Sequence, residues 1–565
     1  MTYLETYEQW MKSVKDSELL EELKSIKDDD KQIKERFFAD LPFGTAGLRG
    51  VIGAGIARMN RYVVGRATQG LADYLKKGSE DNLKMAIAYD SRRFSREFAQ
   101  EAACVLAGNG IKAYLFKQLT SVPELSFAVR YLKADGGIVI TASHNPKEYN
   151  GYKVYASYGG QLGPEESLGV MECIQKLNAF TDVRSIGYED GLKSGMITEV
   201  GEEIDRVYYQ RIVELCGSDS AEGFKVVYTP LHGTGLRTAQ HIFPAAGISD
   251  FNVVEEQKTP DGSFPTVNSP NPEDPNAMKM AIELAKRLGA EIAIGTDPDA
   301  DRMGAAVRRA DGSFAMLTGN QIGCLLTDYL LRKRWEDGKL KPTDYVIRSF
   351  VSTDMAEAIA KGYGVVCYTV LTGFRFISEI IAENEGTEKE FVFGFEESFG
   401  FLSGDIARDK DGVLAGLLLC KAAEYYRTRG KSLLEVLDEL YRQHGYFRES
   451  VRSIAFAGLV GMEKMQQLMM RLREKPITEV DGLAVARVED YKTRKSTGAD
   501  GVVSDIKLPA TNALKLFFGD GEWACIRPSG TEPKIKIYMA ARACSADEAA
   551  ERLARLDAGI KKLLA

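Results

Sequence analysis

Three aspartates stand at alternate positions of one short segment and could hold a metal ion together. Asp297, Asp299 and Asp301 come shortly after the apolar run 292–294. Carboxylates this close repel one another unless a cation lies between them. An EF-hand calcium loop is excluded because the sixth and twelfth positions, counted from Asp297, are both arginines. Mg²⁺ fits better, since it prefers oxygen ligands and usually shares an oxygen of a substrate; the alternative is a solvated acidic turn.

One serine lies where a nucleophile could reach a ligand. Ser143 is in the segment 141–146 (Thr-Ala-Ser-His-Asn-Pro) after the apolar run 137–140, and α/β proteins usually bind ligands at the C-terminal ends of strands. Its hydroxyl is a weak nucleophile that needs a base, a metal or an earlier covalent modification. His144 is its neighbour in sequence, which does not by itself orient the imidazole toward the hydroxyl. A G-x-S-x-G motif is missing, so an α/β-hydrolase elbow is not supported, and a plain turn is the alternative.

Two further polar segments suit a sugar phosphate. Residues 394–400 place carboxylates and a hydroxyl among aromatic and glycine residues, as the hydroxyls of a sugar require, although a capped helix start fits as well. Residues 527–534 combine an arginine, two hydroxyls and a glycine in an anion nest or a plain turn. The chain has neither a P-loop nor a complete dinucleotide fingerprint, so ATP and NAD are not indicated.

Nine short apolar runs predict the strands that carry these segments. They form three triplets, and the third run of each triplet leads into a polar loop. Helix-like segments such as 95–108 and 275–288 lie between the runs, which favours βαβ units and a mostly parallel sheet. The period is too long for a solenoid, so we expect tandem similar domains, with a chance pattern as the alternative. The runs are 85–89, 113–116 and 137–140; 225–228, 252–254 and 292–294; 345–348, 365–368 and 391–393.

The two ends of the chain do not follow the pattern of apolar runs and polar loops. The N-terminal 40 residues predict one or two surface helices. Residues 449–565 contain alternating strand-like segments and a final amphipathic helix that begins near Ser545, with acidic residues in its first turn. We therefore expect a separate α+β domain at the C-terminal end.

Composition narrows the classes of function. Lys and Arg number 73 against 81 Asp and Glu, for a net charge of −8, which disfavours a general nucleic-acid binder. The eight cysteines and four histidines show no zinc or redox spacing. A signal peptide and a long apolar run are missing from the sequence, so we expect a cytoplasmic protein that does not bind membranes.

The four polar segments together resemble the α-D-phosphohexomutase family. Residues 141–146 look like its phosphoserine loop, 297–302 its metal loop, 396–398 its sugar loop and 527–531 its phosphate loop. They occur in the family's order and span most of the chain. The resemblance implies an α/β fold: three tandem similar domains with mixed, mostly parallel sheets around a cleft, plus a smaller C-terminal α+β domain. The expected boundaries are 1–205, 206–318, 319–440 and 441–565.

The resemblance also assigns roles to residues. It implies that Ser143 is phosphorylated in the active form and shares a Mg²⁺ ion with the three aspartates. Lys153 matches the proposed general acid/base, for which a depressed pKa is expected, or it only screens the phosphate. Arg49 and Arg302 resemble arginines that hold the phosphoryl group. The implied catalytic residues are Ser143, Lys153, Arg49 and His144; the implied substrate-binding residues are Arg302, Thr372, Gly373, Arg375, Glu396, Ser398, Arg527, Ser529, Gly530 and Thr531.

Two segments bear on the identity of the sugar, and they favour different substrates. The Glu-Glu-Ser-Phe-Gly sequence of residues 396–400 favours the glucose-type branch, which interconverts glucose 1-phosphate and glucose 6-phosphate. Residues 43–50 also resemble relatives that act on pentose phosphates or make glucose 1,6-bisphosphate. We expect the glucose reaction, with Mg²⁺ as cofactor and a reorienting glucose 1,6-bisphosphate as intermediate and activator. Pentose or mannose phosphates, or a silent sugar-phosphate-binding protein, are the alternatives. The oligomeric state is not predicted.

Overall fold

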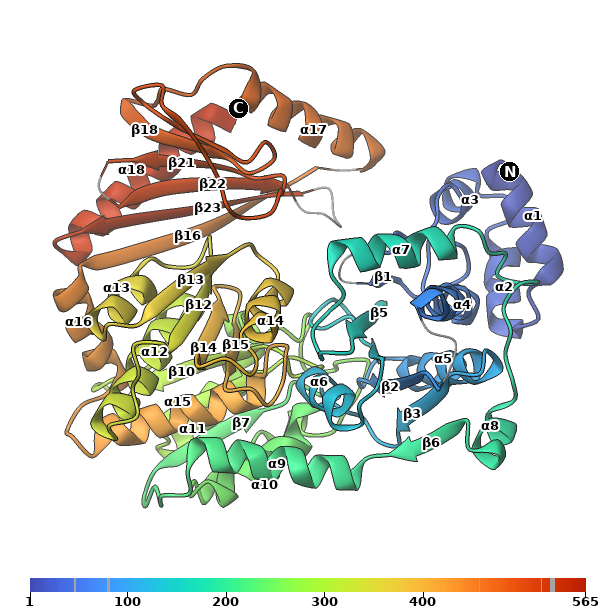
Figure 1. Ribbon diagram of the computed structural model, residues 1–565, viewed down its shortest axis with the longest axis horizontal. Coiled ribbons are helices and arrows are strands. Elements are labelled where there is room, and N and C mark those ends of the chain that lie inside the picture. Colours follow the sequence, from blue (N-terminus) through green and yellow to red (C-terminus); the bar gives the residue numbers. More distant parts are fainter. Residues whose placement is uncertain (45–46, 79–81, 457, 520, 529–533, 565) are drawn as a thin grey trace.

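A computed structural model describes residues 1–44, 47–78, 82–456, 458–519, 521–528 and 534–564 (Figure 1). Four sheets follow one another along the chain, and three of them mix parallel and antiparallel pairs, whereas the fourth is antiparallel. The three α/β layers and the C-terminal α+β unit agree with the predicted fold class. No helix of the described residues is long and apolar enough to cross a membrane.

The first three sheets repeat one topology. In each, the first strand lies between the second and the third, all parallel, and a fourth strand runs antiparallel beside the third. The predicted triplets are therefore confirmed. The strands, in that order, are β2 (Lys84–Tyr89), β3 (Lys112–Phe116), β4 (Gly136–Ile140) and β5 (Tyr149–Ala156); β7 (Lys225–Thr229), β8 (Asp250–Val253), β9 (Ile292–Thr296) and β10 (Met303–Arg308); β12 (Tyr345–Ser349), β13 (Val366–Val370), β14 (Phe391–Glu396) and β15 (Gly400–Ser403).

The fourth strand of each unit was not predicted. β10 is buried along nearly its whole length and β15 has only four residues, so neither shows the alternation of a half-buried strand. This strand matters because it makes the connection after the third strand a hairpin in all three units. The polar segments 141–148, 297–302 and 397–399 are these hairpins, named here the serine loop, the aspartate loop and the third-domain loop. β1 (Leu48–Val51), β6 (Ile197–Val200) and β11 (Phe314–Met316) extend the first two sheets.

Helices cover the sheets, and two of them match the predicted ranges, α5 (Ser95–Gly108) and α11 (Pro275–Leu288). The prediction of one or two N-terminal helices was wrong, because three are present. Asp16 and Asp29 cap the second and third of them, and these caps are hidden within charged runs. The remaining helices of this part are α1 (Tyr3–Ser13), α2 (Ser17–Ser25), α3 (Asp30–Phe37), α4 (Arg61–Gly78), α6 (Val122–Tyr131), α7 (Pro164–Ile174), α8 (Tyr188–Ser194), α9 (Glu202–Cys216) and α10 (Gly235–Ala245).

The second and third sheets share one core. α15 (Gly412–Arg427) contacts β9, β10 and β15, and its Leu417 and Leu419 are fully buried. This shared core fixes the aspartate loop relative to the third-domain loop. The expected boundaries after residues 205 and 440 fall inside the continuous helices α9 and α16 (Leu433–His444), and the division into domains stays a prediction. The other helices here are α12 (Gly319–Glu336), α13 (Met355–Gly362) and α14 (Phe374–Glu383).

The C-terminal unit lies above the third sheet in Figure 1. Its strands follow the order β16-β23-β22-β21-β18-β19-β20, and the predicted final helix α18 (Ala546–Leu564) is capped by Ser545, whose Oγ accepts a hydrogen bond from Glu548 N at 3.2 Å. Trp523 and Phe350 belong to the apolar cluster that joins this unit to the third sheet. The elements are β16 (Tyr446–Ala455), α17 (Gly458–Glu474), β17 (Glu479–Val480), β18 (Leu483–Asp490), β19 (Lys495–Gly498), β20 (Val503–Asp505), β21 (Leu514–Phe518), β22 (Glu522–Pro528) and β23 (Lys534–Ala543).

Candidate active site

The serine loop presents Ser143 to the aspartate loop of the second sheet. Ser143 is buried and has a φ of 52°, an uncommon conformation for a residue with a side chain. Its Oγ donates to Asp297 Oδ2 at 2.6 Å and lies 3.1 Å from His144 Nδ1, while its N–H donates to Thr141 Oγ1 at 2.8 Å. The hydroxyl is thus fixed against a carboxylate that is 154 positions away in sequence.

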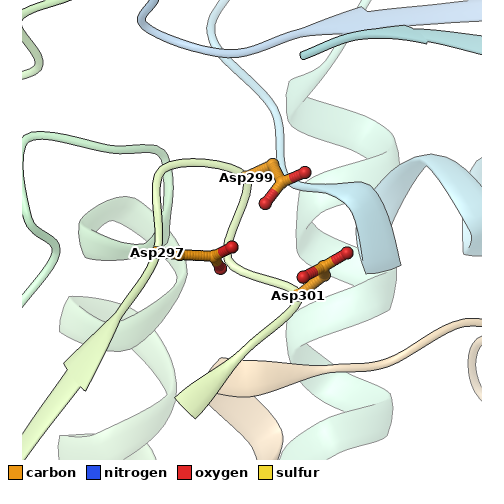
Figure 2. Close-up of side chains that lie close together, drawn as sticks. All are labelled: Asp297, Asp299 and Asp301. Carbon is orange, nitrogen blue, oxygen red and sulfur yellow. The ribbon is translucent and has the colours of Figure 1, made fainter. Parts of the chain in front are cut away.

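The aspartate loop gathers three carboxylates at one point, as Figure 2 shows. Oxygen atoms of Asp297, Asp299 and Asp301 lie within 4.8 Å of one another, and all three side chains are buried. Burial raises the pKa of Asp297 well above its usual value, and the charges of the other two carboxylates add to the rise. Asp299 Oδ1 and Asp301 Oδ1 are buried without a hydrogen-bond partner. These orphaned oxygens and the mutual repulsion fit a hard divalent cation.

Two lysines approach the same carboxylates. Lys153, on β5, donates from Nζ to Asp299 Oδ2 at 2.8 Å and to Asp301 Oδ2 at 3.3 Å. The expected depressed pKa of Lys153 is not found: burial alone would lower it, but the two carboxylates outweigh burial and raise it. Lys410 Nζ lies 3.2 Å from Asp301 Oδ2 and 2.8 Å from Asp409 Oδ1.

Lys410 was missed by the sequence analysis. It lies in the segment 404–411, which joins β15 to α15. A sequence signal for Lys410 was present, because the residue belongs to a charged cluster that follows an apolar run. It was overlooked because β15 itself was not predicted, so the cluster had no strand to follow.

Arg92 was also missed by the sequence analysis, although it binds the backbone of the serine loop. Its buried guanidinium donates to four backbone carbonyls: Ser143 O at 2.6 Å, Pro146 O at 2.9 Å, Tyr149 O at 3.0 Å and Asn145 O. The planar guanidinium can reach several carbonyls at once because its donors spread over a rigid fork. No motif in the sequence indicates this contact, since Arg92 is 51 positions from Ser143.

Arg92→Lys is expected to destabilise the fold and slow turnover. An ammonium keeps the charge but cannot span four carbonyls, so we expect a loss of about 2–4 kcal/mol in unfolding free energy and a fall of kcat by about tenfold or more, read from urea unfolding and steady-state kinetics. Arg93→Lys is the matched control, because Arg93 is the next residue in the chain and its side chain is exposed. Equal stability and kcat in the two variants would contradict this role for Arg92.

Three other predicted catalytic or phosphate-contacting residues lie in or beside the serine and aspartate loops. Arg49, on β1, donates to Asn145 Oδ1 at 3.1 Å. Arg302 donates to Glu273 Oε1 at 2.7 Å and to the carbonyl of Ser398 at 3.0 Å, which links the aspartate loop to the third-domain loop. Burial, followed by the charges of Arg302 and Arg49, lowers the pKa of His144 well below its usual value. A neutral imidazole beside Ser143 Oγ follows from this environment.

The predicted sugar contacts meet at the third sheet. Glu396 Oε1 accepts from Gly373 N at 2.7 Å, and Gly373 has a φ of 115°, which favours glycine. Thr372 precedes it, half-buried, in the turn between β13 and α14. Burial lowers the pKa of Arg375, and the positive charge of Arg527 contributes, so the third domain and the C-terminal unit bring two cations together. Ser529, Gly530 and Thr531 lie outside the described residues.

The fold and the site define an enzyme built from three α/β units and a C-terminal unit, with a serine against a carboxylate cluster. Four consecutive segments match the phosphoglucomutase/phosphomannomutase family: α/β/α domain I over residues 40–180, domain II over 206–312, domain III over 318–444 and the C-terminal domain over 469–558. The chain belongs to this family, and the resemblance to the α-D-phosphohexomutases is confirmed. It is therefore an intramolecular phosphotransferase of the isomerase class.

Curated relatives match nearly the whole chain. A phosphoglucomutase of Staphylococcus epidermidis is 40% identical over 502 residues, which are 88% of this chain and 90% of the relative. One from Staphylococcus saprophyticus is 36% identical over 95% of this chain and 97% of its own. Among solved structures, the Paramecium phosphoglucomutase parafusin has a TM-score of 0.68 at 18% identity, covering 93% of this chain and 95% of its own, which supports the fold.

Proposed function

We propose that this enzyme interconverts glucose 1-phosphate and glucose 6-phosphate through a phosphoserine at Ser143. The observation that carries the proposal is the 2.6 Å contact between Ser143 Oγ and Asp297 inside the carboxylate cluster. The name phosphoglucomutase, borne by staphylococcal relatives up to 40% identical over most of the chain, supports glucose as the sugar. We further propose a cytoplasmic location, supported by eight cysteines without a disulfide.

The phosphoryl group is proposed to pass from Ser143 to a free hydroxyl of the sugar monophosphate. The O–P bond to Ser143 breaks and a bond from phosphorus to the sugar oxygen forms. Lys153, held as an ammonium by Asp299 and Asp301, gives a proton to the leaving Ser143 oxygen, and the proton of the sugar hydroxyl replaces it on Nζ. The resulting glucose 1,6-bisphosphate reorients, and its other phosphate returns to Ser143. A Mg²⁺ ion held by Asp297, Asp299, Asp301 and the phosphoserine would offset the charge on the transferring group.

The remaining site residues are proposed to orient the sugar phosphate. Arg49 and Arg302 hold the reacting phosphoryl group, and His144 keeps the Ser143 hydroxyl in place. Glu396 and Ser398 accept and donate hydrogen bonds to sugar hydroxyls. The distal phosphate is bound by the cations of Arg375 and Arg527, together with Thr372, Gly373, Ser529, Gly530 and Thr531. The same set must accept both orientations of the bisphosphate, because the reaction is an exchange between two positions of one sugar.

The sugar is tested by comparing kcat/KM for four substrates. We expect glucose 1-phosphate to exceed mannose 1-phosphate, N-acetylglucosamine 1-phosphate and ribose 1-phosphate by about tenfold or more, which is about 1.4 kcal/mol of discrimination. A higher value for ribose 1-phosphate would overturn the choice of sugar but not the phosphoserine. Stabilisation by sugar phosphates without any isomerisation would instead identify a silent binding protein.

A further inference from the structure

We propose that a pocket between the third domain and the C-terminal unit binds a small organic polyanion, through carboxylate or phosphate oxygens, at a site separate from the candidate active site. The pocket has a volume of about 490 Å³, which is in the range of small-molecule sites. One wall comes from the ends of β12 and β13, and the other from β18 to β21 of the C-terminal unit.

The acidic side chains that line this pocket already have partners. Each of the three is held by a cation or by polar hydrogens, so their charges are compensated within the protein. The contacts are Asp354 Oδ1 to Arg348 at 2.8 Å and Oδ2 to Trp523 Nε1 at 2.9 Å, Glu489 to Tyr491 Oη at 2.7 Å and to Arg487 at 3.4 Å, and Asp505 to Lys495 at 2.7 Å.

Two lysines of the lining have no such compensation. Among the described residues, neither Lys507 nor Lys515 has a carboxylate within 4.0 Å. Lys515 is 5% exposed; its Nζ donates to Phe350 O at 2.7 Å and lies 3.9 Å from the Trp523 ring. An ammonium carries three donors, so it retains capacity for a ligand. Burial lowers the pKa of Lys515 to about 8, the response expected of a cation without a close counterion.

A third donor belongs to the opposite wall. Arg348 is 5% exposed, and its Nε is buried without a hydrogen-bond partner. Thr369, Ser496 and Ser504 also line the pocket. Two uncompensated ammonium groups and one orphaned guanidinium N–H suit a ligand with at least two negative charges. Since Arg348 and the lysines come from different units, a bound anion would bridge them and restrain their relative movement.

Trp523 is a natural reporter beside the pocket, because it contacts the lining residues Lys515 and Asp354. Trp10→Phe and Trp335→Phe leave it as the single tryptophan of the chain, and its emission depends on the charge held against its ring. Citrate and inorganic phosphate are titrated separately, so that carboxylate and phosphate ligands are told apart. We expect a saturable change in emission with at least one of them, and an affinity about tenfold weaker after Lys507→Ala, an exposed position that should not disturb the fold. Lys515→Met should abolish the response.

Arg527→Ala separates this pocket from the active site, where phosphate is also expected to bind. We expect the Trp523 response to persist in that variant. A response that vanishes with Arg527→Ala but survives Lys507→Ala, or no saturable change with either anion, would overturn the proposal. Turnover is not measured, so failure here leaves the proposed reaction untouched.

Discussion

Replacing Ser143 with alanine is expected to abolish turnover, with kcat/KM falling by at least about 10³-fold. Its Oγ is the hydroxyl that contacts the carboxylate cluster, and the proposed covalent intermediate cannot form without it. A coupled assay that follows formation of glucose 6-phosphate measures the loss. Intact-mass and peptide mapping should also find phosphate on Ser143 in the parent protein.

Ser157→Ala provides the matched control. Ser157 lies just after β5 in the same domain, and its side chain is exposed. We expect its activity to equal that of the parent. The unfolding midpoint of Ser143→Ala should stay close to that of the parent, so that lost activity is not lost folding. Full activity in folded Ser143→Ala protein would refute the phosphoserine.

Asp299→Asn is expected to cost at least about 10³-fold in kcat/KM, which corresponds to about 4 kcal/mol of transition-state stabilisation. The substitution removes one charge from the cluster while keeping the shape of the side chain. One Asp299 oxygen already accepts from Lys153 and Thr141, and the other is the orphaned atom available to a cation. Metal binding should therefore weaken together with activity.

Mg²⁺ binding can be measured by thermal unfolding, without an activity assay. Added Mg²⁺ should raise the Tm of chelator-treated parent protein by mass action, and it should have a much smaller effect on Asp299→Asn. Asp311→Asn is the control, because Asp311 is in an exposed turn of the same domain and should respond like the parent. An unchanged Mg²⁺ response in Asp299→Asn would show that the aspartate cluster does not bind the ion.

The chemistry of the loops could be predicted from the sequence because it depends on residues that are neighbours in the chain. The runs that became β4, β9 and β14 are short and apolar. Ser143, the three aspartates or Glu396 come within a few residues of the end of each run, and such patterns need no knowledge of distant contacts. The repeated βαβ order followed from the same runs. Helix ends were predictable where a cap was visible, as at Ser545, but not where Asp16 and Asp29 were hidden among other charges.

Only the tertiary structure decided which distant groups act on one another. Lys153 and Asp299 are 146 positions apart, yet their 2.8 Å contact reverses the direction expected for the pKa of Lys153. Arg92 lies between β2 and α5, and Lys410 lies between β15 and α15. They belong to the site because the packing of the units places them against the serine and aspartate loops. The sequence by itself determined the chemical groups and the strands that bear them, since side-chain type and periodicity are local. Distances, burial and the balance of charges depend on how separate units pack against one another. That packing cannot be predicted from any single segment of the sequence.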